Sequence, residues 1–407
     1  MFIGTEFGIY FSYNKGTNWM KLEGPTIPFR DIAIHQRDND LVGASFGRGF
    51  FVLDDYTPLR NIKEAVTSTA STLFPVRDAW WYVPTIPMQA KGMPSQGSAH
   101  YVGPNPAFGA VISYYLPEVA KNRNDLREER EKAIKKSKGN VPFPGWEELN
   151  AERKESDPQA LLHIKDADGN TVRWIEAINK KGFQRVTWDL KRPAPDPIEL
   201  FKPAFQPPWA GDAEGPLVAP GVYSATLYIE NNGELIARGE PQSFTVKPIP
   251  ALEQTDFEAI AAFQQMTSDV MLEISSAGQR LGEAGERLKF IRAALKQTPK
   301  VSAEHFQTWS TLDQQLADLQ YELYGDPAKG SLDESRLPGI WGKVGLVAYG
   351  HWGTTQLPTE TFKNNLKTGI DEFEVFKGKM ETYLNDLESF EATLESIGAP
   401  YTKGRRK

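Results

Sequence analysis

The chain of 407 residues contains no cysteine, which excludes disulfide bonds, thiolate metal sites and a cysteine nucleophile. No apolar run reaches the roughly 18 to 20 residues of a membrane-spanning helix, so no membrane span is predicted. The net charge of −7 argues against a nucleic-acid partner, because phosphate contacts need clustered Lys and Arg. The first residues lack the basic and long apolar regions of a signal peptide.

Sequence patterns for catalysis are also missing. The five histidines show no H-x-H or H-E-x-x-H spacing, and the chain has neither a G-x-S-x-G elbow nor a phosphate-binding glycine loop. Asp54 and Asp55 are adjacent, but neighbouring residues of a strand point to opposite faces and cannot flank one sugar ring. We therefore assign no catalytic residue and expect neither a metal nor a cofactor.

What the chain does contain is typical of an ordinary folded protein with two or three domains of roughly 150 residues each. Its beginning shows short strand-like runs separated by turn residues. These runs cover residues 2–5, 8–12, 19–22, 29–35, 40–45 and 50–53. Strands at this spacing favour four-stranded propeller blades, and each of the two groups shows three.

The turn between the second and third runs resembles the Asp-box of BNR or sialidase-type β-propellers, S-x-D-x-G-x-[ST]-W. The matching residues are Ser12, Asn14, Gly16 and Trp19, with Asn14 in the Asp position and Asn18 where Ser or Thr is usual. The resemblance implies that a short side chain accepts backbone N–H bonds, that the glycine takes a positive φ and that the aromatic ring packs between strands. The motif is a structural device and does not by itself indicate an activity.

Three further phrases resemble the last blades of large bacterial BNR propellers, which are often labelled sortilin-like or glycosyl hydrolase-like. They lie at residues 4–8, 37–40 and 46–55. We expect residues 1–75 to be the incomplete last blades of such a propeller, because a closed ring needs at least four. The resemblance implies an exported protein, whether periplasmic, on the outer surface or extracellular. It also implies a companion chain or an upstream segment that completes the ring, with this chain as a split-gene product, a processed fragment or a truncated sequence.

Residues 76–107 are rich in proline and are predicted to be a linker. They include the aromatic run Trp80, Trp81 and Tyr82. These rings either stack on sugars or pack the propeller against the next domain, and the second use is favoured.

Residues 108–250 contain alternating strand-like runs that predict a β-sandwich. The runs cover 109–116, 161–166, 171–175, 182–190, 219–229 and 243–246. The set resembles the FlgD-type Ig-like domain of exported bacterial proteins, by an I-x-D-x-x-G hairpin at 164–169, a strand at 182–190 and an A-P-G-x-Y strand at 219–223. Relatives use this domain as a spacer or docking module.

Two insertions interrupt the predicted sandwich. Residues 118–157 are strongly charged and predict a solvated helix or a mobile excursion. Residues 192–218 predict a long loop rich in Pro and Gly, with Phe201, Phe205 and Trp209.

Residues 251–400 carry four apolar stripes with helical spacing, which predict four amphipathic helices in an antiparallel bundle. The stripes begin at Phe257, Leu281, Phe306 and Phe362. Residues 336–353 are expected to form a long Gly- and Trp-rich loop, in which Trp341, Tyr349, His351 and Trp352 line a ligand platform or, as we favour, pack between domains. The basic residues 401–407 are predicted to be a solvated tail.

The expected fold class is thus multidomain β plus α, with terminal propeller blades, an Ig-like β-sandwich and an antiparallel helical bundle. The favoured function is non-catalytic: protein or glycan binding, or assembly, as the C-terminal part of an exported propeller protein. The alternative is a sialidase-like glycoside hydrolase whose catalytic residues lie in upstream blades, to which only Arg30 or Arg48 could contribute here. A third possibility is that aromatic loops bind glycans without hydrolysing them. The candidate docking residues are Arg48, Trp80, Trp81, Trp341, His351 and Trp352.

Overall fold

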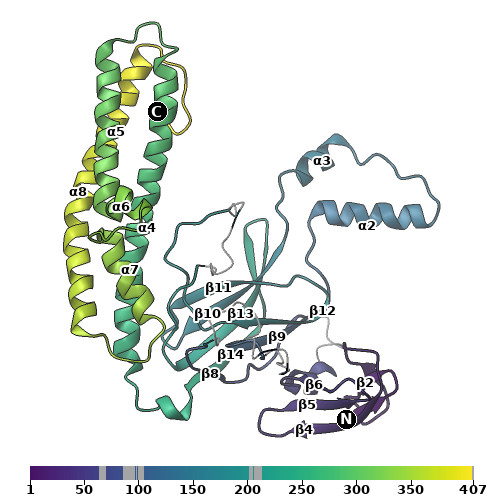
Figure 1. The fold of residues 1–407 in the computed structure, drawn as a ribbon. Coiled ribbons are helices and arrows are strands. Elements are labelled where there is room, and N and C mark those ends of the chain that lie inside the picture. Colours follow the sequence, from purple (N-terminus) through teal and green to yellow (C-terminus); the bar gives the residue numbers. More distant parts are fainter. Residues whose placement is uncertain are drawn as a thin grey trace. The chain divides into compact units, whose positions relative to one another are not determined.

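The computed structural model describes residues 1–63, 70–85, 97, 99, 105–200, 205 and 213–405 (Figure 1). This part of the chain is a mixed β and α protein with fourteen strands and seven α-helices. It divides into two compact units, one of residues 1–190 with 220–251 and one of residues 191–219 with 252–407. Phe201, Trp209 and part of the predicted linker lie outside the described residues.

The six strands predicted at the beginning of the chain are all present, and they form two three-stranded antiparallel sheets. The first sheet contains β1 (Phe2–Thr5), β2 (Gly8–Phe11) and β3 (Met20–Lys21); the second contains β4 (Phe29–His35), β5 (Asp40–Ser45) and β6 (Phe50–Leu53). The two sheets meet at Gly4, where a Cβ would lie only 3.0 Å from the Phe29 carbonyl oxygen. Phe11, Phe29 and Leu41 form the small buried core. A 3₁₀ helix, Thr57–Arg60, follows.

The other eight strands of the first unit form two more sheets, in the orders β11-β10-β13-β14-β8 and β12-β9-β7. Their bounds are β7 Thr72–Leu73, β8 Ala79–Trp81, β9 Ala110–Leu116, β10 Gln159–Asp166, β11 Thr171–Ala177, β12 Gly182–Trp188, β13 Gly221–Asn231 and β14 Glu234–Pro248. Trp188 of β12 is fully buried and contacts Tyr223 and Phe244, so the sheets share one apolar core. The expected linker is partly wrong, because β8 pairs with β14 as a parallel edge strand.

The charged insertion forms two helices, α2 (Arg123–Lys136) and α3 (Trp146–Glu152), which confirms the helical alternative for this segment. Asn122 and Asp125 form a capping box at the start of α2, each side chain accepting a backbone N–H of the other residue. Among the described residues of these two helices none is buried as a whole, although the Glu152 side chain is only 6% exposed in its ion pair with Arg127.

The described residues of the second unit contain five α-helices, four of which surround one apolar core (Figure 1). The helices are α4 Phe257–Leu295, α5 Ala303–Tyr324, α6 Pro327–Ser331, α7 Ile340–His351 and α8 Glu360–Ser396, after a short 3₁₀ helix at Pro250–Leu252. The expectation of separate helices for the first two stripes is wrong, since both lie on α4. The buried residues Ile274, Ala277 and Leu281 keep the helical spacing through this stretch, which holds no proline to end the helix. No described helix is long and apolar enough to cross a membrane.

The prediction of a loop at residues 336–353 is also wrong, because most of this segment is helix α7. Its glycines suggested a loop, but glycine allows close approach here. A Cβ on Gly350 would lie 2.9 Å from the Phe362 ring, and one on Gly369 of α8 would lie 2.5 Å from Val344 of α7. Removing side chains at these contacts lets α7 lie directly against the neighbouring segment.

The basic tail is not solvated as expected, at least through residue 405. Thr402 and Arg405 are buried. The Arg405 guanidinium donates to the Pro400 carbonyl oxygen at 3.0 Å, and a Cβ on Gly404 would lie 3.0 Å from Cγ of Arg287 in α4. The tail therefore packs against the helices of its own unit, and Arg406 and Lys407 lie outside the described residues.

Candidate functional sites

The Asp-box-like turn has the expected bonding but not the expected position of its aromatic ring. Ser12 Oγ accepts the Gly16 N–H at 2.8 Å, and Asn14 Oδ1 accepts the Asn18 N–H at 2.8 Å, while Gly16 has a φ of +91°. Trp19 is 39% exposed and lies over Gly16 instead of packing between strands. The Ser12 hydroxyl also donates to Asn14 Oδ1 at 3.0 Å, so these side chains bond the turn's own backbone and one another. The turn therefore orients β2 and β3 and shows no group arranged for catalysis.

A cluster of metal-ligating residue types lies at the turn between β4 and β5, and sequence spacing did not indicate it. The ligating atoms of His35, Asp38 and Asp40 all lie within 4.8 Å of one another. Two arginines already neutralise the carboxylates: Arg37 donates to Asp38 at 2.9 Å, and Arg77 lies 3.6 Å from Asp40. Because these guanidinium groups disfavour a cation, the geometry fits an ion-pair network that closes the turn.

The same network extends to strand β12 of the first unit. Arg185 donates to the backbone carbonyl oxygens of Asp54 and Asp55, each at 2.9 Å. Burial, together with the charge of the neighbouring Asp40, raises the pKa of Asp54 above its usual range. A carboxyl group with a raised pKa is the chemical type of a general acid. Sequence analysis missed this pairing because the β5–β6 hairpin separates Asp40 from Asp54.

The N-terminal sheets carry apolar side chains that the described residues leave uncovered. A groove of about 560 Å³ is lined by Phe2, Ile32, Ile34 and Leu59, together with the buried Phe11 and Tyr56 and others. Large apolar side chains elsewhere on these strands and turns are also exposed, namely Ile3, Phe7, Phe46, Phe50 and Val52. Arg48 is exposed in the turn between Phe46 and Phe50. We call the residues that line the groove, together with these exposed apolar side chains, the N-terminal apolar surface.

The aromatic run on β8 is divided between core and surface. Trp81 is 3% exposed, whereas Trp80 is 51% exposed and pairs in register with Lys247 of β14. Lys247 forms an ion pair with Asp78 beside the Trp80 position. Tyr82 makes an edge contact with Phe108 at 4.9 Å. Trp80 therefore remains a candidate for stacking on a sugar, while Trp81 is a core residue.

The predicted platform in the second unit is not assembled. His351 is only 1% exposed, packs against Phe263 and Phe362, and bonds the Gln356 carbonyl oxygen through Nε2 at 3.0 Å. Burial lowers the pKa of His351 below its usual range. Trp341 and Trp352 both pack against the apolar core, and the Trp341 ring also lies 6.3 Å from the exposed Tyr349 ring. Helix α7 thus turns His351 and Trp352 inward, which a loop interpretation did not foresee.

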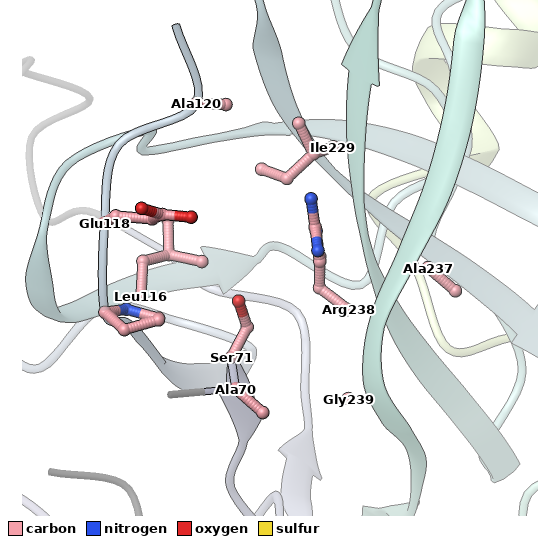
Figure 2. A pocket seen from close by; sticks show the side chains of 10 residues that line it. Ala70, Ser71, Leu116, Glu118, Ala120, Ile229, Ala237, Arg238 and Gly239 are labelled. Atoms are coloured by element: carbon pink, nitrogen blue, oxygen red, sulfur yellow. The ribbon is translucent and has the colours of Figure 1, made fainter. Parts of the chain in front are cut away.

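A polar pocket of about 240 Å³ opens beside the ends of β9 and the β13–β14 hairpin (Figure 2). Glu118 and Arg238 point toward one another across it, and Leu116 and Ile229 line it with apolar atoms. The sequence held no pattern for this site, since its charged residues lie far apart in the chain and come together only through strand pairing.

We also compared the chain with known proteins. No protein-family model, curated protein or solved structure matches it. The functional assignment therefore depends on the residues and on their geometry.

Proposed function

We propose that this chain is a non-catalytic part of an exported BNR-repeat propeller protein that acts in protein or glycan binding, or in assembly. In this proposal the two N-terminal sheets are terminal blades of a β-propeller. The β7–β14 strands are a FlgD-type Ig-like sandwich that serves as a spacer or docking module. Helices α4, α5, α7 and α8 form an antiparallel bundle.

The observation that carries the proposal is the N-terminal apolar surface. Phe50 is 78% exposed, and Phe7 and Phe46 are also largely exposed on these short sheets. Burying one such side chain is worth about 1.5–3 kcal/mol, so a partner that covers several of them gains substantial free energy. The partner that fits is further β-sheet with a complementary apolar face, because β1, β3, β4 and β6 are the edge strands of these two sheets in the described residues. A companion chain or an upstream segment carrying more blades would supply it.

The carboxylates at the turn between β4 and β5 support a structural role. Asp38 and Asp40 are engaged by Arg37, Arg77 and the Asp55 backbone N–H. One observation favours the glycoside hydrolase alternative: Asp54 has a raised pKa, as a general acid requires. A sialidase would also need an arginine triad and a Tyr–Glu pair, which the hydrolase alternative places on other blades.

Binding is tested by producing the chain together with the polypeptide encoded immediately upstream, either fused or as a separate chain. Hydrogen exchange should slow in β1 and β6 when the upstream polypeptide is present. Phe50→Ser and Phe7→Ser should abolish that protection, whereas Leu126→Ser on α2 should not. Unchanged exchange in β1 and β6 would contradict the assembly proposal.

The non-catalytic part of the proposal has a separate test. The same complex is assayed with fluorogenic glycosides, including a sialoside, and compared with Asp54→Asn. We expect no turnover. Turnover that disappears in Asp54→Asn would overturn the non-catalytic proposal and establish the hydrolase alternative.

A further inference from the structure

The pocket in Figure 2 has two charged walls of opposite sign that do not touch. Glu118 follows strand β9, and Arg238 lies on β14. Within the described residues the two side chains form no ion pair with each other, although they face one another across the pocket. The Ser71 hydroxyl points into the same space, and Ile229 lies beside the guanidinium.

Arg238 is the side chain of this pocket that a bound anion would stabilise most. It is partly buried, and in the described part of the chain it has no anionic partner. Partial burial weakens the hydration of a guanidinium group, which then gains most from a carboxylate or another oxyanion bound by its two parallel N–H donors. Glu118 is exposed on the opposite side and accepts hydrogen bonds only, which favours a cationic donor.

We propose that this pocket binds a small zwitterion of the α-amino acid type. Arg238 binds the carboxylate, and Glu118 binds the ammonium group. The two charges of an α-amino acid are joined through one carbon, so the molecule can bridge two opposite charges that face one another across one pocket. The volume of about 240 Å³ has room for a small side chain against Leu116 and Ile229.

The location gives the ligand a structural consequence. Glu118 stands at the base of the insertion that carries α2 and α3, and Arg238 belongs to the β13–β14 hairpin. The C-terminal end of the insertion already contacts this hairpin, because Asn232 Oδ1 accepts the Ser156 N–H at 3.3 Å. A bound amino acid would therefore connect the N-terminal end of the insertion to the same hairpin.

The test titrates L-alanine into the full chain and measures its dissociation constant by calorimetry. Acetate and methylammonium, which carry one charge each, are titrated in parallel. We expect L-alanine to bind at least about tenfold more tightly than either, the ratio that one charge-assisted hydrogen bond supplies. The dipeptide Ala-Ala separates a free amino acid from a peptide as the source of the zwitterion, and its more distant charges should bind more weakly.

Variants assign the two charges. Arg238→Gln and Glu118→Gln should each weaken L-alanine binding about tenfold or more. Arg153→Gln, which changes an exposed arginine of the same unit, should leave it unchanged. Arg238→Lys keeps the charge but loses the two-pronged donor, so it should bind with intermediate affinity, and it decides the matter if Arg238→Gln does not fold. The proposal is overturned if L-alanine binds no more tightly than acetate or methylammonium, or if both charge-removing variants bind it normally.

Discussion

Two helical regions of this chain are stabilised in different ways. Helices α4, α5, α7 and α8 bury apolar side chains around a shared core. Helices α2 and α3, both fully described, contain no buried apolar residue, and ion pairs connect them to one another. Arg127 alone binds Glu131 and Glu152, and Arg130 binds Glu148.

The comparison shows that helical sequence alone does not determine what holds a helix in place. Apolar burial contributes roughly 25 cal/mol per Å², whereas an exposed ion pair contributes at most about 1 kcal/mol and weakens with salt. We therefore expect the core helices to unfold cooperatively and the α2–α3 pair to open locally.

The largest effect is expected from a cavity in the helical core. Phe376 of α8 is fully buried beside Phe373. Phe376→Ala should lower the free energy of unfolding of this unit by about 3–5 kcal/mol. The matched change Leu126→Ala on α2, where the side chain is exposed, should stay within about 0.5 kcal/mol. Urea denaturation followed by hydrogen exchange separates the two regions, and equal effects would contradict the comparison.

A slightly smaller loss is expected from a buried ion pair between two of the core helices. Arg287 of α4 donates to Glu391 of α8 at 3.0 and 2.6 Å, and the Glu391 carboxylate raises the pKa of Arg287. Arg287→Met leaves the Glu391 charge buried without a partner, which should cost about 3 kcal/mol, with the methionine filling part of the space.

The control for this change is Arg280→Met. Arg280 binds Glu381 across the same two helices, but both side chains are exposed. Its loss should cost no more than about 1 kcal/mol in the same denaturation experiment. If Arg287→Met is equally mild, burial does not distinguish the two pairs.

A pH dependence of the core helices comes next. Burial lowers the pKa of His351 in the folded state, so the unfolded state binds the proton more readily. Stability should be unaffected well above the unfolded pKa of about 6.5 and should fall as the pH drops below it. Denaturation at pH 7.5 and 5.5 measures this, and His351→Leu should reduce the difference while His35→Gln in the other unit should not. A slope that His351→Leu leaves intact would come from another group.

How far the sequence predicted these regions depends on the local signals. Turn residues such as Gly8 and Gly16 placed the N-terminal strands correctly, because glycine with positive φ marks a turn. Apolar spacing located α5 and α8 but not the continuity of α4. The glycines of α7 suggested a loop because local propensity does not reveal that Gly369 and Val344 meet.

The candidate sites were less predictable than the fold. The bonding of Asn14 in the Asp-box-like turn is local, so four residues suffice to predict it. Pairs such as Asp40 with Asp54, or Glu118 with Arg238, depend on strand pairing between segments that are separated in the chain. No local sequence pattern predicts such pairs. The inward position of His351 likewise depends on the neighbours of α7 in the core.

The smallest effect is expected in α2 and α3, and it is the sharpest test of the comparison. Arg127 donates to Glu152 at 2.7 and 3.0 Å and to Glu131 at 2.7 Å, and these partners raise its pKa. Arg127→Gln should speed hydrogen exchange in both helices without changing exchange in α4 or α8.

Salt should act in the same direction, because the Debye length shrinks from about 10 Å at 0.1 M to about 3 Å at 1 M. We expect 1 M NaCl to speed exchange in α2 and α3 of the unchanged chain and to have less effect in Arg127→Gln, which has already lost the central pairs. Lys132→Gln, which removes only the exposed pair with Glu128 on the same helix, should have a weaker effect than Arg127→Gln. If neither salt nor Arg127→Gln changes the exchange rates, the ion pairs do not stabilise these two helices. The capping box at Asn122 and the connections to the neighbouring strands would then hold them in place.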